Sequence, residues 1–90
     1  MTKQIAVVAY GSLAQRLRIP AAQPQPRYLA ACRPLGQVLG ALGLTGDDIQ
    51  LAMINHRAVD LAQTVRPGDR IALFPKEYPI FADWHAYRSP

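Results

Sequence analysis

Residues 50–75, QLAMINHRAVDLAQTVRPGDRIALFP, combine short apolar runs with turn residues, and this stretch decides the fold class. The run at residues 50–54 is mostly apolar and predicts a strand. Asn55 and His56 follow it. We expect them to form a tight hairpin, because Asn accepts a positive φ and His tolerates one better than most residues. The sequence therefore predicts a short return strand at residues 57–61.

A second turn and a last strand complete this stretch. Pro67 and Gly68 form a turn pair in which the glycine supplies a positive φ. The run RIALFP at residues 70–75 then alternates so that Ile71 and Leu73 face a core. We expect the last strand to end at the proline that closes this run, because proline has no N–H for further pairing.

The N-terminal third of the chain predicts two more strands. Residues 4–10, QIAVVAY, are almost continuously apolar, which indicates burial on both faces and a central position in a sheet. Residues 13–26 contain three prolines, so we predict a long loop there and leave open one helical turn at residues 13–17. Residues 27–32 form the second strand candidate.

One short helix is predicted after the second strand. Pro34 suits the first helical position, where its missing N–H is not needed. The apolar residues after it recur at helical spacing on one face, and they are Leu35, Val38, Leu39 and Leu42. Gly43 is placed to end the helix in a left-handed turn. Asp47 and Asp48 then begin a polar turn before the next strand.

The order of these elements is strand, strand, helix, short strand pair and strand, which is an α+β arrangement. A helix across one face of a mixed sheet, with the first and last strands as central parallel neighbours, satisfies the right-handed crossover rule. We therefore predict a ubiquitin-like β-grasp roll with a mixed sheet of four to five strands and one helix packed across it. We place the domain at residues 1–75 and an aromatic C-terminal tail at residues 76–90.

Length and composition narrow the class of protein. The 90 residues fit one domain, and 50% of them are apolar, which excludes a multidomain enzyme and a disordered chain. No apolar run approaches the ~18 residues that a membrane-spanning helix needs. Cys32 is the single cysteine, so no internal disulfide can form. We expect a cytoplasmic protein without membrane contact, in which Cys32 is a small buried hydrophobe.

Charge is distributed unevenly along the chain. Residues 1–46 hold five basic residues and no acid (+5), whereas residues 47–90 hold five basic and six acidic residues (−1). Such asymmetry favours an anionic partner, either nucleic acid or an acidic protein surface. No aromatic or glycine-rich nucleic-acid motif accompanies the arginines, so we prefer a solvated basic surface and consider nucleic acid the weaker expectation.

The segment from Leu44 to Pro75 resembles the small sulfur carriers of molybdopterin and thiamin synthesis, the MoaD/ThiS family of β-grasp proteins. Their pattern runs from an apolar strand through a Val-Asn-Gly hairpin and an apolar pair to a Gly-Asp turn and a strand that closes in Phe-Pro. The corresponding positions here are Ile54-Asn55-His56 at the hairpin, Val59 and Leu61 at the pair, Pro67-Gly68-Asp69 at the turn and residues 71–75 at the close. The first strand and the helix match more loosely.

The chemistry of that family resides in a Gly-Gly that follows the last strand by a few residues. An activating enzyme adenylates the terminal carboxylate, which becomes the thiocarboxylate that delivers sulfur. Glycines are needed because the tail threads a narrow channel in the partner. No glycine follows Gly68 in this sequence. The resemblance therefore implies the fold and a partner-binding role, and we do not expect thiocarboxylate sulfur transfer.

Aromatic side chains stand where the glycines would be expected. Five of the seven aromatic residues recur roughly every third position, and they are Phe74, Tyr78, Phe81, Trp84 and Tyr87. We predict that they bind a protein partner, because Tyr and Trp dominate binding hot spots. Alternatively the tail folds back, completes a thin core or covers a sheet edge. Exchange of tails between two copies would give a homodimer.

The remaining polar residues predict no catalytic or metal-binding constellation. Asp83, His85 and Ser89 are close in sequence, but nothing rigid orients them, so chance proximity is the preferred interpretation. His56 and His85 lack partners at metal-ligand spacing. We expect no catalytic residue, no metal site and no cofactor.

The sequence thus predicts a non-enzymatic ubiquitin-like protein that acts by protein–protein contact. The resemblance implies a protein partner such as an enzyme of a sulfur or molybdopterin pathway. Two alternatives stay open. One is a sulfur carrier or accessory protein in molybdopterin or thiamin biosynthesis that works by an unrecognised route, such as a lysine conjugate or a sulfur on Cys32. The other is a nucleic-acid-binding β-grasp module.

Overall fold

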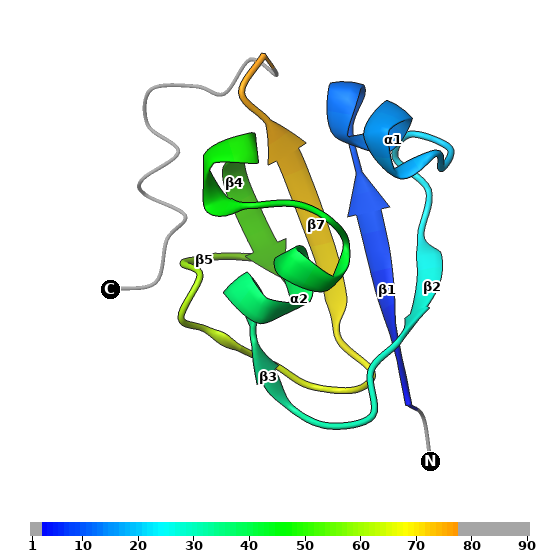
Figure 1. Ribbon diagram of the computed structural model, residues 1–90. Helices are drawn as coiled ribbons and strands as arrows, with labels where there is room; N and C mark the ends of the chain where they lie inside the picture. The colour runs from blue at the N-terminus through cyan, green and yellow to red at the C-terminus, as the bar shows by residue number, and fades with distance from the viewer. Residues whose placement is uncertain (1–2, 78–90) are drawn as a thin grey trace.

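The computed structural model describes residues 3–77, and these contain two α-helices, a 3₁₀ helix and seven strands (Figure 1). The helices are α1 (Gly11–Leu17), α2 (Leu35–Ala41) and the 3₁₀ helix η1 (Gly46–Asp48). The strands are β1 (Gln4–Ala9), β2 (Gln25–Tyr28), β3 (Arg33–Pro34), β4 (Ile49–Ile54), β5 (Arg57–Val59), β6 (Thr64–Val65) and β7 (Arg70–Pro75).

Five strands form one mixed sheet in the order β2-β1-β7-β4-β5. The central strands β1 and β7 are parallel, with Val8 opposite Ala72. β2 pairs antiparallel with β1, and β4 pairs antiparallel with β7 and β5. The short strands β3 and β6 form a separate antiparallel pair. The predicted α+β class is confirmed, as is the parallel pairing of the first and last strands.

The turn at Asn55 and His56 has the backbone conformation that the sequence predicts. Their φ angles are 51° and 71°, the pair of positive values that a type I′ hairpin requires. The Asn55 side chain donates to Asp69 Oδ1 at 2.9 Å and accepts from the Arg70 N–H at 2.9 Å. These two bonds tie the β4–β5 hairpin to the turn at Gly68, whose φ is 96° as expected.

Residues 13–26 are not one long loop, and the described residues contain two α-helices where one was predicted. α1 buries Leu13 and Ala14 and ends at Arg18, which takes a left-handed φ of 58°. The helical turn left open at residues 13–17 is confirmed, whereas the prediction of a loop is wrong for these residues, because their apolar spacing extends over a single turn. The three prolines that argued against regular structure lie beyond the helix and do not interrupt it.

Several predicted boundaries also shift. β2 occupies Gln25–Tyr28 instead of residues 27–32. Pro26 is tolerated there because β2 is an edge strand, where a missing N–H costs no bond in the sheet. Pro34 is the N-cap of α2 rather than its first residue.

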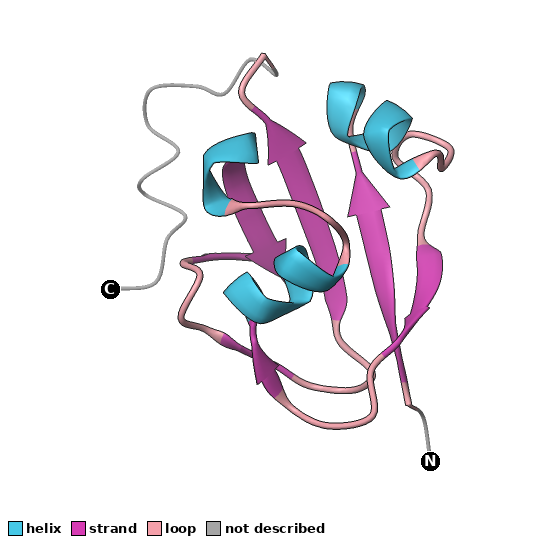
Figure 2. Cartoon of the chain, in the orientation of Figure 1, coloured by secondary structure: helices cyan, strands magenta, loops and turns pink. Residues whose placement is uncertain are grey.

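The core lies between the sheet and the two helices. α2 crosses one face of the sheet (Figure 2) and buries Leu35, Val38 and Leu39 against it. Ile71 and Leu73 are fully buried, as predicted. Cys32 is exposed, so the prediction of a buried cysteine is wrong. It lies between β2 and β3 in a segment outside the five-stranded sheet.

Candidate functional site

The face of the sheet opposite the helices is mostly apolar, although Gln4 and Arg70 also lie on it, at one end. Residues directly opposite on neighbouring strands share a face. Val8 lies opposite Ala72, and Ala72 lies opposite Met53. None of the three belongs to the cluster that packs against α1 and α2. We call this surface the outer face and define it by Ala6, Val8, Tyr10, Leu51, Met53, Ala58, Ala72 and Phe74.

The centre of the outer face is buried, whereas the residues around the centre are partly exposed to solvent. Val8 and Ala72 are 0% and 4% exposed. Leu51, Met53 and Phe74 around them are half-buried, so their side chains still present apolar surface to solvent. A contiguous apolar surface of this kind indicates a site of contact with another apolar surface.

Phe74 is the one predicted site residue among those described. Its ring stacks on that of Tyr10, with centroids 4.6 Å apart and 8° between the planes. This stack lies at the end of the central strand pair, where the Tyr10 N–H donates to the Leu73 carbonyl. Tyr78, Phe81, Trp84 and Tyr87 lie outside the described residues, as does the rest of the predicted tail from residue 78 onward.

We did not predict from the sequence that Tyr10, Leu51 and Met53 lie on the outer face. The signal was present in β4, where IQLAMI is apolar at almost every position. A run of this kind supplies one set of side chains to the core and the alternate set to the opposite face. Ile54 enters the core, whereas Leu51 and Met53 do not.

The chain that leaves β7 is fastened to the start of α1. Glu77 accepts hydrogen bonds from the Ser12 backbone N–H at 2.8 Å and from the Ser12 hydroxyl at 2.9 Å. These bonds, the backbone one first, hold the pKa of the Glu77 carboxyl below its ordinary value. Glu77, the last residue that the structure describes, is therefore held at the N-terminal end of α1.

A second carboxylate is held at the start of β4. Asp48 accepts from the Thr45 backbone N–H at 2.8 Å and pairs with Arg16 at 2.7 Å. The Thr45 N–H, followed by Arg16, lowers the pKa of the Asp48 carboxyl. Thr45 and Asp48 form a capping box on η1, which confirms the turn expected there. Both carboxylates are thus structural.

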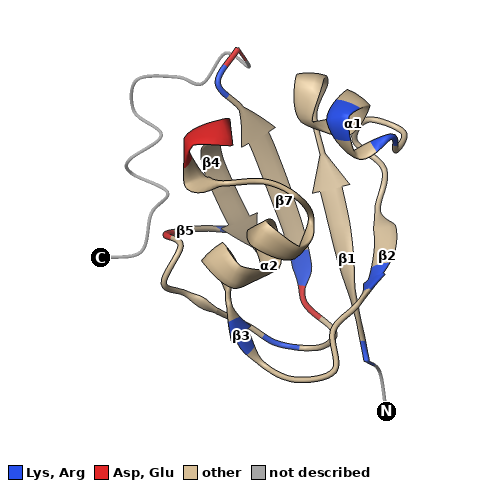
Figure 3. Cartoon of the chain, viewed as in Figure 1, with Lys and Arg blue, Asp and Glu red and all other residues tan. Residues whose placement is uncertain are grey.

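A pocket of about 290 Å³ opens between β2 and α2. Leu29, Val38 and Ala41 are among its apolar lining residues, and Arg27 and Arg33 are its charged ones. None of its lining residues within 3–77 is Asp or Glu. Figure 3 shows basic residues on β2 and β3 at the same end of the domain.

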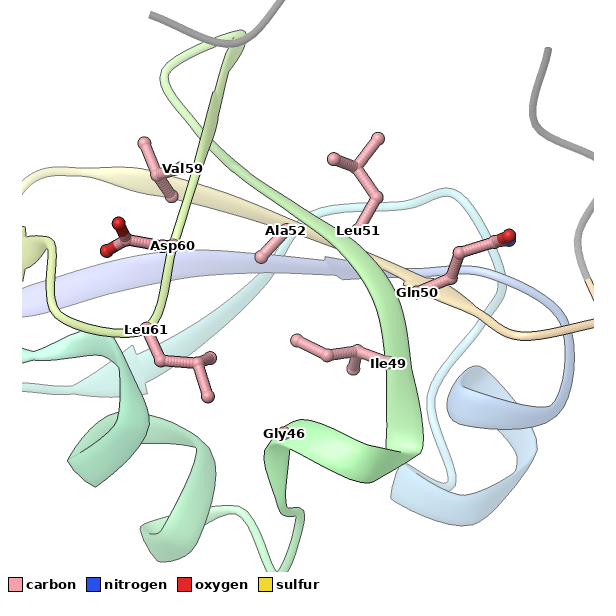
Figure 4. Close-up of a pocket in the computed structure, with 8 residues that line it drawn as sticks. All are labelled: Gly46, Ile49, Gln50, Leu51, Ala52, Val59, Asp60 and Leu61. Atoms are coloured by element: carbon pink, nitrogen blue, oxygen red, sulfur yellow. The ribbon is translucent and has the colours of Figure 1, made fainter. Parts of the chain in front are cut away.

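A smaller pocket of about 200 Å³ lies between η1, β4 and β5. Figure 4 shows Ile49 and Leu61 pointing toward each other across it, whereas Asp60 and Gln50 point away. The Asp60 carboxylate accepts from the Ala62 N–H at 3.0 Å, so it caps a turn. The interior of this pocket is therefore apolar and carries no reactive group.

Residues 3–77 contain no group of three or more His, Cys, Asp or Glu side chains that could hold a metal ion. Within the same residues, neither α-helix has the length and apolar character needed to cross a membrane.

The chain was compared with protein-family models, with curated proteins and with solved structures, and none of the three comparisons gave a match.

Proposed function

We propose that this protein is a ubiquitin-like β-grasp module that works by binding another protein, and not by catalysis. The sheet order β2-β1-β7-β4-β5, with a parallel central pair and α2 across one face, supports the β-grasp assignment. The observation that carries the binding role is the outer face. It offers half-buried Leu51, Met53 and Phe74 around a closed apolar centre.

The character of the described side chains favours contact over chemistry. The pKa values of catalytic groups are commonly shifted by burial in a cleft. No polar or charged side chain among residues 3–77 is buried. Two carboxylates have lowered pKa values. Asp48 caps η1, and Glu77 holds the chain after β7 to Ser12 at the start of α1.

The proposed binding role includes the aromatic tail. Tyr78, Phe81, Trp84 and Tyr87 follow Glu77 in the sequence, and Glu77 is fastened near Phe74. We propose that they bind the same partner as the outer face. The contact is of the kind in which a few aromatic anchors carry most of the binding energy.

Sulfur transfer by an unrecognised route is the second candidate, because Cys32 is exposed. Intact-mass spectrometry of protein isolated from its host under sulfur-demanding growth separates the two. The binding module predicts the unmodified mass, whereas added sulfur or a covalent conjugate would favour the carrier.

The binding role is tested by co-purification from the host, with partners identified and quantified by mass spectrometry. Met53→Glu places a charge on the outer face and should deplete a specific partner at least about tenfold, the loss that about 1.4 kcal/mol produces. Gln15→Glu, on the exposed side of α1, is the matched control and should retain the partner. Equal recovery from both variants, each folded by thermal melting, would contradict the proposal.

A further inference from the structure

We propose that the pocket between β2 and α2 binds an extended peptide segment of a protein partner, with an apolar side chain in the pocket and acidic side chains on Arg27 and Arg33. The inference rests on the proposed function, because its occupant is a protein. It assigns a second site on the opposite side of the sheet from the outer face.

The charge of the pocket points to an anionic occupant. Arg27 donates to the Pro26 carbonyl at 2.8 Å and is half-buried, which leaves its other N–H groups available. Arg33 is exposed and has no ion pair among the described residues. Since none of the described lining residues is acidic, a carboxylate of the peptide would meet two guanidinium groups without a competing carboxylate among them.

The walls and the size of the pocket point to an apolar side chain. Leu29 and Val38 are buried at 6% and 5% exposure and form the floor, and Ala41 lies at the exposed end of α2. A volume of about 290 Å³ is at the small end of ligand pockets, which suits one or two side chains of a peptide. A nucleic acid strand would find aliphatic walls here instead of the stacked aromatic platform that such strands use.

The edge of the sheet adds a backbone partner. β2 is the outermost strand on its side of the five-stranded sheet. The Leu29 N–H donates to the Lys3 carbonyl beside β1, so the alternate residue Tyr28 directs its N–H away from β1, toward the open edge. An extended peptide lying in the pocket can accept a hydrogen bond from this N–H, as peptides do when they add to a sheet edge.

The test is an NMR titration of the ¹⁵N-labelled full chain with a heptapeptide probe that has three central leucines flanked on each side by two aspartates. The largest amide shifts should fall on Tyr28 to Ala30 and on Val38 to Ala41. The same peptide with asparagine in place of aspartate should bind about tenfold more weakly, because it loses several exposed ion pairs. An oligothymidine of similar charge should not shift these residues.

Three variants test whether the peptide binds in this pocket. Ala41→Trp fills the pocket from an exposed position and should abolish the shifts, while an otherwise unchanged spectrum reports an intact fold. Arg33→Gln should weaken binding about threefold, whereas Lys76→Gln should have no effect, because it makes the same charge change at an exposed residue that follows β7 and does not line the pocket.

Three results would overturn the pocket assignment. They are an absence of shifts at saturating peptide, equal affinity for the asparagine peptide, and shifts at Met53 and Phe74 in place of those at the pocket. The last result leaves the proposed binding function standing. If the proposed binding function is wrong, the co-purification experiment shows it, because Met53→Glu and Gln15→Glu then recover the same proteins. That experiment alters the outer face and leaves the pocket unchanged.

Discussion

The rings of Tyr10 and Phe74 stack in parallel, with centroids 4.6 Å apart, where the two central strands of the sheet end. Tyr10 follows β1 and Phe74 belongs to β7, so the stack joins the first and last strands of the domain. It also forms one end of the outer face and lies near the point where Glu77 fastens the outgoing chain.

A double-mutant cycle on this pair measures how far the stack stabilises the fold. Phe74→Leu and Tyr10→Leu each keep apolar bulk but remove one ring. Aromatic pairs are worth about 0.5–1.5 kcal/mol beyond the area that they bury. We expect a coupling free energy in the lower part of that range from urea denaturation, because both rings are half-buried. Additive effects of the two changes would show that the stack contributes nothing to stability.

The bond between Ser12 and Glu77 predicts a pH dependence of stability. The pKa of Glu77 is lowered in the folded state by the Ser12 N–H and hydroxyl. Its contribution is therefore fully present above its ordinary pKa of 4.5 and is lost as the pH falls through the lower folded-state value. Urea denaturation between pH 6 and pH 3 should give a steeper loss of stability for the wild type than for Glu77→Gln.

Asp48 serves as the internal control for that measurement. Its pKa is also lowered, by the Thr45 N–H and Arg16, so some acid destabilisation should persist in Glu77→Gln. Identical pH profiles for the wild type and the variant would refute the role assigned to the Ser12–Glu77 bond.

Two glycines at the C-terminal end of α2 should respond to alanine in opposite ways. Gly40 lies inside the helix, and a Cβ there would meet nothing within 4 Å, so Gly40→Ala should raise the free energy of unfolding by up to about 1 kcal/mol. Gly43 has a φ of 81°, so Gly43→Ala should lower it by about 1 kcal/mol or more. Changes of the same sign in denaturant midpoint would contradict the helix end described here.

The aromatic tail gives a prediction about binding rather than stability. Replacing Phe81 and Trp84 with alanine should weaken capture of the partner and leave the melting temperature largely unchanged. A marked fall in melting temperature would instead mean that these rings complete the core. Calorimetry and quantified co-purification on the same preparation distinguish the two.

Turn chemistry was the most predictable part of the fold. Asn55, His56 and Gly68 carry the positive φ angles expected of them, because few residue types accept such angles and the sequence places them between apolar runs. α1 was predicted only as an optional helical turn at residues 13–17, because an amphipathic pattern is hard to recognise within a single turn. Its burial depends on Leu13 and Ala14 meeting side chains that are distant in sequence.

The candidate sites were less predictable than the fold. Phe74 was identified from its place in an aromatic series, but the outer face depends on which residues of β1, β4 and β7 lie opposite one another. The pocket between β2 and α2 could not be predicted, because it is formed by tertiary packing and because β2 occupies Gln25–Tyr28 instead of the predicted residues 27–32. Periodicity within one strand does not reveal its neighbours. An excess of basic residues before position 47 was the one sequence feature that pointed toward Arg27 and Arg33.

The most direct test of the central claim is site-specific photo-crosslinking in the host. A photoreactive phenylalanine analogue is placed at Met53 on the outer face and, separately, at the exposed Gln15 on α1. We expect Met53 to yield a discrete crosslink to one protein partner that Gln15 does not form, and we expect Phe74→Leu to weaken this crosslink. A Met53 profile that matches the Gln15 profile would contradict the claim that the outer face is where this protein binds.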